Sequence, residues 1–105
     1  MKYISAPYSK TDDKDTRMSI VTAYSANCLK RNELIICPLT MGHNFTKYAQ
    51  LPYDSDWWLK WCFALLILCD EMDVLCIDEW EVSYGVQAEI EFANQNNIKV
   101  NYIKL

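Results

Sequence analysis

Glycine, proline and histidine are scarce in this chain of 105 residues, which contains two glycines, three prolines and one histidine. Two glycines are too few for a G-x-G-x-x-G dinucleotide-binding turn, and Gly42 and Gly85 lie too far apart in the sequence for a P-loop. The five cysteines include no C-x-x-C pair, so the ligand spacing of a zinc site is missing and we expect no metal. Scattered cysteines of this kind are typical of small buried side chains in a reduced, cytoplasmic protein.

Positive charge is also scarce. The formal net charge is −4, the isoelectric point is near 4.8, and no basic cluster is longer than the pair Lys30 and Arg31. This balance argues against a surface for nucleic acid or for an anionic membrane. The strongly apolar residues 59–69 are interrupted by Lys60 and fall short of the ~20 residues of a membrane span. We also expect no signal peptide, because Met1 leads directly into a predicted strand.

Apolar residues make up 51% of the chain, which is enough for one globular domain. Short apolar segments predict strands at residues 2–6, 33–37, 73–77 and 99–103. Segments with helical spacing or a long apolar run predict helices at residues 14–31 and 54–69, and a third helix that opens at Ser83. We expect the run 38–53, which carries glycine, histidine and proline, to be a long functional loop with one helical turn.

Strands that alternate with helices predict βαβ units and a parallel sheet. We therefore expect a three-layer α/β fold of the Rossmann-like or flavodoxin-like kind. Its sheet should have four or five strands, with helices on both faces. Ligands of such sheets bind outside the carboxyl ends of the strands. One of those ends leads into the helix that opens at Ser83, so we expect the binding site there.

The predicted helix is apolar on nearly every side between residues 57 and 69, where Lys60 is its one charged residue. One face can cover the sheet, but the other face also needs cover. A homodimer or higher homo-oligomer built on this helix is one solution, and we favour it because a large exposed apolar patch is unusual. The other solution is that the run 38–53 folds over the helix.

The stretch SYGVQAEIEFA at residues 83–93 has the spacing of a helix with one inward face. The residues at i, i+3, i+4 and i+7 are Val86, Glu89, Ile90 and Ala93. Glu89 therefore points toward the interior, where an unpaired charge is costly. Two interpretations remain open. Glu89 is the working carboxylate of a site, or it is a core carboxylate paired with Lys or Arg.

The start of the same helix is suited to a small anion. Ser83 is a natural N-cap, and Gly85 has no side chain to keep a ligand away from the backbone. The N–H groups at a helix N-terminus attract anions. The alternative is that Ser83 and Gly85 provide a cap and a packing gap without any ligand.

Four segments together resemble the nucleoside 2-deoxyribosyltransferase-like superfamily, in particular its small phage and bacterial members. They are YISAPYS at residues 3–9, PLTMGH at 38–43, CDEMDVLCIDEW at 69–80 and SYGVQAEIEFA at 83–93. The most specific part is the S-x-G-x-x-x-E spacing of Ser83, Gly85 and Glu89. The resemblance covers nearly the whole chain. It implies a single domain over residues 1–105 that cleaves or transfers the N-glycosidic bond of a (deoxy)nucleoside 5′-monophosphate or nucleoside.

The resemblance implies that Glu89 is the catalytic nucleophile. It would attack the anomeric carbon and form a covalent glycosyl-enzyme, which water or a second base resolves. We expect the helix N-terminus to favour the ionised form of Glu89 against the upward pKa shift caused by burial. Ser83 corresponds to a serine that holds a 5′-phosphate in the nucleotide-cleaving branch. This chemistry requires no metal or organic cofactor.

The resemblance also implies further contacts with substrate. The end of the first strand forms one wall of the pocket, and Trp80 lies in the loop that leads into the site. Tyr8 and Arg17 are candidates for base stacking and phosphate pairing. The alternatives are an exposed loop position for His43 and a structural role for Asp70. The full set of expected substrate-binding residues is Tyr3, Ser5, Ala6, Pro7, Tyr8, His43, Asp70, Trp80, Ser83 and Gly85.

One position departs from the family pattern. Enzymes of the family carry an Asp eight residues before the Asp that matches Asp70, and this chain has Cys62 there. A thiol does not do the proton work of a carboxylate in the same way. Three outcomes remain open. Asp56, Asp70 or Asp73 compensates, the base leaves without acid assistance, or the protein is a catalytically inactive nucleotide-binding module.

Overall fold

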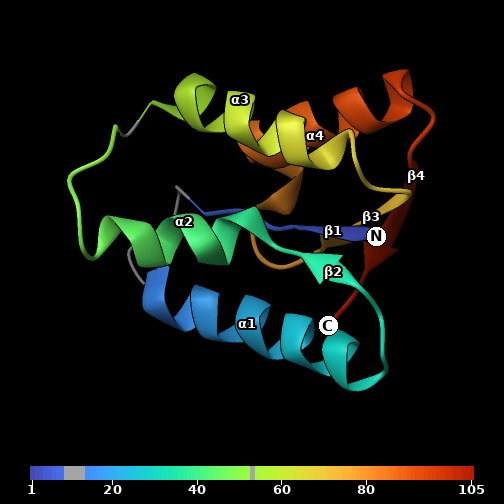
Figure 1. Ribbon diagram of the computed structural model, residues 1–105, viewed down its shortest axis with the longest axis horizontal. Helices are drawn as coiled ribbons and strands as arrows, with labels where there is room; N and C mark the ends of the chain where they lie inside the picture. Colours follow the sequence, from blue (N-terminus) through green and yellow to red (C-terminus); the bar gives the residue numbers. More distant parts are fainter. Residues whose placement is uncertain (9–13, 53) are drawn as a thin grey trace.

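Figure 1 shows a computed structural model of the chain, in which residues 1–8, 14–52 and 54–105 are described. Four parallel strands form one sheet in the order β2-β1-β3-β4. The strands are β1 (Lys2–Ser5), β2 (Ile35–Ile36), β3 (Glu71–Leu75) and β4 (Lys99–Ile103). Helix α1 (Lys14–Lys30) covers one face, and α3 (Ser55–Leu66) and α4 (Tyr84–Gln95) cover the other. The predicted three-layer, Rossmann-like α/β architecture is therefore confirmed.

The order of the strands creates a switch point between β1 and β3. The chain first runs from β1 through α1 to β2, and later adds β3 on the opposite side of β1, with β4 beyond it. At such a point the connections on either side diverge, so a crevice opens outside the carboxyl ends of the two central strands. This is the edge of the sheet at which Ser5 ends β1.

Alternation along the strands divides the core into two clusters. The cluster beneath α3 and α4 includes Tyr3, Leu66, Met72, Val74, Val86 and Ile90. The cluster beneath α1 includes Ile4, Met18, Val21 and Leu75. Because successive side chains of a strand point to opposite faces, Tyr3 and Ser5 of β1 both point toward the layer that contains α4.

Much of the run 38–53 is helical and not the long loop that we expected, and residue 53 of this run lies outside the described residues. Helix α2 occupies Pro38–Thr46, with Pro38 at the start of the helix, where its missing N–H costs no hydrogen bond. Gly42 lies inside this helix, and a Cβ atom added to it would come within 3.0 Å of the Trp58 ring of α3. The proline and the glycine that predicted a loop therefore start the helix and let it pack closely on α3.

The other elements lie close to their predicted positions. The second strand is shorter than predicted, and the third begins and ends two residues earlier. A short 3₁₀ helix, η1 (Trp80–Val82), interrupts the predicted loop after β3. All five cysteines carry free thiols. Within the described residues, no helix combines the length and the apolar character needed to cross a membrane.

The outer surface of α3 is covered in part by α2 and the residues that follow it. The rings of Phe45 and Trp61 lie 6.2 Å apart between their centroids, and Trp58 Nε1 donates a hydrogen bond to the Pro52 carbonyl at 2.7 Å. The run after Pro38 thus contacts α3, which agrees with the alternative that this run folds over the apolar helix. Trp57 is still 46% exposed and Leu68 is 68% exposed. An oligomer through this surface stays a prediction.

Candidate active site

A cavity of about 490 Å³ lies beyond the carboxyl end of β1. This volume falls in the range of roughly 300–1,000 Å³ that is usual for small-molecule sites. The N-terminal parts of α1, α2, α3 and α4 all contribute to its wall, through Lys14, Pro38, Ser55 and Gly85. A helix N-terminus carries partial positive charge, so this convergence favours a ligand with negative charge.

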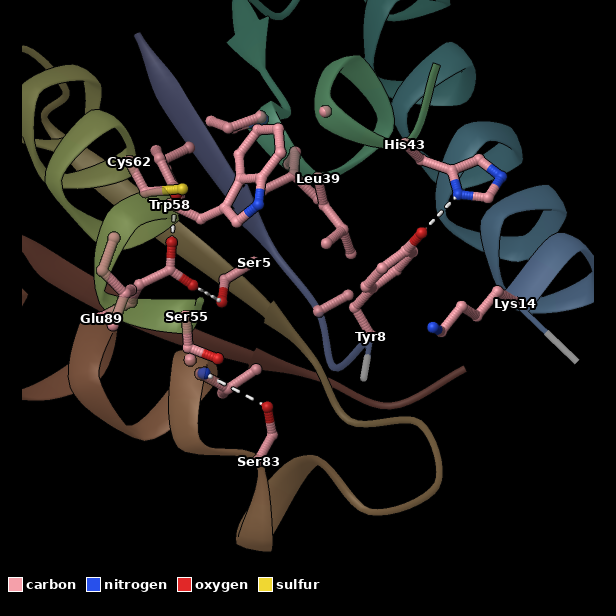
Figure 2. A pocket seen from close by; sticks show the side chains of 18 of the residues that line it. Ser5, Tyr8, Lys14, Leu39, His43, Ser55, Trp58, Cys62, Ser83 and Glu89 are labelled. Atoms are coloured by element: carbon pink, nitrogen blue, oxygen red, sulfur yellow. Dashed lines mark hydrogen bonds between the residues drawn. The ribbon is translucent and has the colours of Figure 1, made fainter. Parts of the chain in front are cut away.

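Glu89 lies on one side of the cavity and its side chain points into it (Figure 2). The residue is 7% exposed. The Tyr3 hydroxyl donates a hydrogen bond to Oε2 of Glu89, and the Ser5 hydroxyl donates to Oε1 at 2.8 Å. None of the ion pairs among the described residues includes Glu89. Two hydroxyl groups from β1, and no Lys or Arg side chain of that part of the chain, therefore hold this carboxyl group.

Burial raises the pKa of Glu89 to about 7, and the hydrogen bonds from Tyr3 and Ser5 lower it only in part. The expected preference for the ionised form at the helix N-terminus does not prevail. Glu89 lies beyond the first turn of α4, and the effect of the helix dipole fades within that turn. The carboxyl group is therefore poised between its acid and its carboxylate form near neutral pH.

Cys62 of α3 lies beside Glu89 and Tyr3. Burial raises the pKa of its thiol to about 12, and the nearby charge of Glu89 acts in the same direction. The same two causes hold the pKa of Tyr3 well above its usual range. At neutral pH both side chains therefore keep their protons. A neutral thiol therefore lies beside the Glu89 carboxyl group.

The start of α4 forms another part of the wall. Ser83 is the N-cap, and its Oγ accepts a hydrogen bond from the Val86 N–H at 3.4 Å, so the predicted cap is present (Figure 2). A Cβ atom added to Gly85 would meet no atom within 4 Å. Since Gly85 lines the cavity, the open space beside it is space for a ligand against the helix N-terminus.

A second polar group lies on the side of the cavity away from Glu89, where Tyr8 and His43 meet (Figure 2). The Tyr8 hydroxyl is 2.7 Å from Nδ1 of His43, and Nε2 of His43 is 3.1 Å from Oδ1 of Asp15. The Lys14 ammonium lies 5.1 Å from the centre of the Tyr8 ring. The side chain of His43 is 14% exposed and belongs to α2, so His43 is not the exposed loop histidine of the alternative interpretation.

The cavity brings together most of the residues that the sequence suggested. Those that line it are Tyr3, Ser5, Ala6, Tyr8, His43, Ser83, Gly85 and Glu89. Pro7 is fully buried and does not line the cavity. Arg17 does not line it either, because its guanidinium turns to the Asp78 carbonyl at 3.0 Å.

Asp70 and Trp80 lie away from the cavity, and for them the sequence interpretation needs correction. Asp70 precedes β3, so it lies at the amino end of the strands, where its carboxylate is 2.8 Å from the Met1 amino group. Trp80 packs on Tyr102 of β4 with 5.6 Å between ring centroids. The structural role that the sequence left open for Asp70 is the one observed.

Some residues of the wall escaped the sequence analysis. They include Lys14, Leu39, Ser55 and Trp58. Trp58 falls in the segment 57–69, which is apolar on nearly every side and for which a core or interface role is the simpler interpretation. Ser55 falls at the start of the helix predicted at residues 54–69, where a serine is expected as a cap. No pattern in the sequence marks Lys14, which reaches the cavity because α1 begins there.

A model of the family described as "Domain of unknown function (DUF1937)" matches residues 1–104, and the chain therefore belongs to that family. No curated protein matches the chain. The family description names no activity, so a function has to be argued from the site.

Proposed function

We propose that this member of the DUF1937 family cleaves the N-glycosidic bond of (deoxy)nucleoside 5′-monophosphates, with Glu89 as the nucleophile. One observation carries the proposal. Glu89 is a desolvated carboxyl group on the wall of a cavity, held by the hydroxyls of Tyr3 and Ser5, with no ion pair among the described residues. Such a group is costly to bury and is therefore typical of a catalytic position.

The chemistry suits the residue. Cleavage of an N-glycosidic bond passes through a transition state in which positive charge develops at C1′. A carboxylate beside C1′ stabilises that charge and then forms the covalent bond. The Tyr3 and Ser5 hydroxyls hold the Glu89 carboxylate in one orientation. The reaction therefore does not have to pay the entropy cost of orienting this group. Because burial raises the pKa of Glu89 to about 7, the fraction of the protein with an ionised nucleophile should rise with pH through neutrality.

The remaining walls support a nucleotide as the substrate. The N-terminus of α4, with Ser83 and Gly85, is suited to a 5′-phosphate. Leu39, Trp58 and Leu59 give the cavity an apolar side on which a flat base can pack. A free nucleoside would lack the contact with the helix N-terminus and should bind less tightly.

A catalytically inactive nucleotide-binding module is the second candidate, and Cys62 favours it. In the described part of the chain, Glu89 is the only acidic residue that lines the cavity. Burial raises the pKa of the Cys62 thiol to about 12, so this residue is a poor acid for the leaving base. A protein with this pocket could bind a nucleotide without turning it over.

Incubation with ribo- and deoxyribonucleoside 5′-monophosphates, followed by chromatography for free base, tests the first candidate. Glu89→Gln should abolish base release, whereas Glu91→Gln, an exposed position of the same helix, should retain it. Release of no base from any nucleotide would refute the glycosidase. If those nucleotides still raise the melting temperature, the binding module is supported, because a bound ligand stabilises the folded state. The absence of both effects would rule out both candidates.

We propose a homo-oligomer through the exposed apolar surface of α3 and the residues after it, in the reducing environment of the cytoplasm. Trp57, Ile67 and Leu68 supply this surface. Light scattering should give at least twice the 12.3 kDa of one chain. A mass of one chain, at the concentration used for the activity assay, would refute the oligomer.

A further inference from the structure

Departure of a base from C1′ is easier when the base receives a proton, and glycosidases supply it from a general acid. The three titratable side chains around the reacting centre do not serve this purpose. Glu89 attacks C1′, while Tyr3 and Cys62 have pKa values raised by burial and by the charge of Glu89. A proton that reaches the base inside the cavity would therefore come from another of its walls.

Tyr8 and His43 lie across the cavity from Glu89 and belong to a chain of three side chains (Figure 2). Nδ1 of His43 is 2.7 Å from the Tyr8 hydroxyl, and Nε2 is 3.1 Å from the Asp15 carboxylate. A carboxylate only accepts hydrogen bonds, so Nε2 carries a hydrogen in this contact. Nδ1 of a neutral His43 then accepts from Tyr8, whereas Nδ1 of a protonated His43 donates to the Tyr8 oxygen.

We infer that Asp15, His43 and Tyr8 form a proton-donating chain that protonates the departing base. Tyr8 is the catalytic acid that contacts the base, and His43 and Asp15 are positioning residues that supply and hold the proton. The inference rests on the proposed function, because it needs a base that leaves inside the cavity. The Asp15 side chain is 84% exposed and that of His43 is 14% exposed, so the chain links the cavity with bulk water.

The proton and electron balance closes with water as the only co-reactant. The C1′–N bond breaks and its electron pair goes to the base nitrogen, while a C1′–Oε bond forms to Glu89. The Tyr8 proton moves to the base, and the Nδ1 proton of His43 moves to the Tyr8 oxygen. Water then attacks C1′, the C1′–Oε bond breaks, and the proton released from water returns to His43. The products are the free base and the sugar 5-phosphate.

The Lys14 ammonium supports the transfer. It lies 5.1 Å from the centre of the Tyr8 ring, which is within the distance of a favourable cation–ring interaction. As the proton leaves Tyr8, negative charge grows on the phenol. A nearby cation stabilises that charge more strongly in a partly buried site than it would in water.

The test compares two substrates: a purine nucleoside 5′-monophosphate that the protein cleaves, and its N7-methylated counterpart. The methylated purine already carries a positive charge and leaves as a neutral base without receiving a proton. Tyr8→Phe and His43→Gln should slow release from the unmethylated nucleotide by about 10²- to 10⁴-fold, the usual contribution of a general acid. Both variants should release the methylated base at close to the wild-type rate. If pyrimidine nucleotides are the ones cleaved, a 5-fluorinated base, which leaves more easily, replaces the methylated purine.

The controls separate this inference from the proposed function. Tyr48→Phe, at an 86% exposed tyrosine outside the cavity, should leave both rates unchanged. Equal losses on both substrates would show that the chain only holds α1 and α2 together, and would overturn the inference. Unchanged cleavage of the unmethylated nucleotide by Tyr8→Phe would overturn it as well. Glu89→Gln should lose base release from both substrates. Wild-type rates in that variant would instead overturn the proposed nucleophile.

Discussion

Replacement of Glu89 by Gln should make the protein more stable at neutral and alkaline pH while removing its activity. The folded chain holds the Glu89 carboxyl group in a desolvated position with two hydroxyl donors. Gln has nearly the same shape and no charge to desolvate. Tyr3 and Ser5 can each rotate their hydroxyls to donate to the amide oxygen or accept from the amide N–H, so the hydrogen bonds need not be lost.

The magnitude follows from the raised pKa. The unfolded chain loses the Glu89 proton near pH 4.5 and the folded chain near pH 7. Below pH 4.5 both states keep the proton, and the carboxyl group carries no penalty. Between pH 4.5 and 7 only the unfolded state releases it, so the free energy of unfolding falls as pH rises. A difference of about 2.5 pKa units at 1.36 kcal/mol each gives a loss of about 3 kcal/mol by pH 8.

The assay is urea unfolding of the wild type and of Glu89→Gln between pH 4 and pH 8. The stability of the variant relative to the wild type should increase by about 3 kcal/mol across this range, which corresponds to a melting temperature difference on the order of 10 °C. Glu91→Gln should show a constant difference, within about 0.5 kcal/mol, because Glu91 is exposed. A relative stability of Glu89→Gln that does not change with pH would refute the claim that burial raises the pKa of Glu89.

Other substitutions test the walls and the supporting core. Gly42→Ala should destabilise the fold by about 1–3 kcal/mol in urea unfolding, because its Cβ would press on a tryptophan ring at 3.0 Å. Gly85→Ala should instead stabilise α4 by up to about 1 kcal/mol, yet weaken the thermal shift produced by nucleoside 5′-monophosphates, because its methyl group enters the cavity. Ser83→Ala should cost about 1 kcal/mol as a lost cap and reduce binding of a nucleotide more than binding of its nucleoside. Tyr24→Phe removes the 2.6 Å hydrogen bond to the buried Asp73 and should cost about 1–3 kcal/mol at an unchanged m-value.

The sequence was most informative where a local pattern determines the structure. The alternation of apolar strands with helices predicted the parallel three-layer sheet, and the spacing around Glu89 predicted its inward position. Ser83 was identified as a cap because it directly precedes the helical pattern. The same logic could have placed Tyr3 and Ser5 on one face of the first strand, since residues two apart on a strand share a face.

The sequence was least informative where packing between distant elements decides the outcome. Proline and glycine in the run 38–53 indicated a loop, but Pro38 begins α2 and Gly42 makes its contact with α3. The contact of His43 with Asp15 joins residues far apart in the chain, and only the packing of α1 on α2 creates it. The pKa of Glu89 depends on how completely the surrounding helices exclude water, which no spacing rule reports.

Tyr3 belongs to the hydrophobic cluster beneath α3 and α4, and it also holds the Glu89 carboxyl group. Attempts to redesign the protein for other substrates therefore face an asymmetry between the two sides of the pocket. Libraries that randomise Tyr3 would mostly yield misfolded chains, whatever they did for selectivity. Diversity introduced at Ser55, an exposed residue of the cavity wall at the start of α3, would reshape the chamber at a smaller risk to expression.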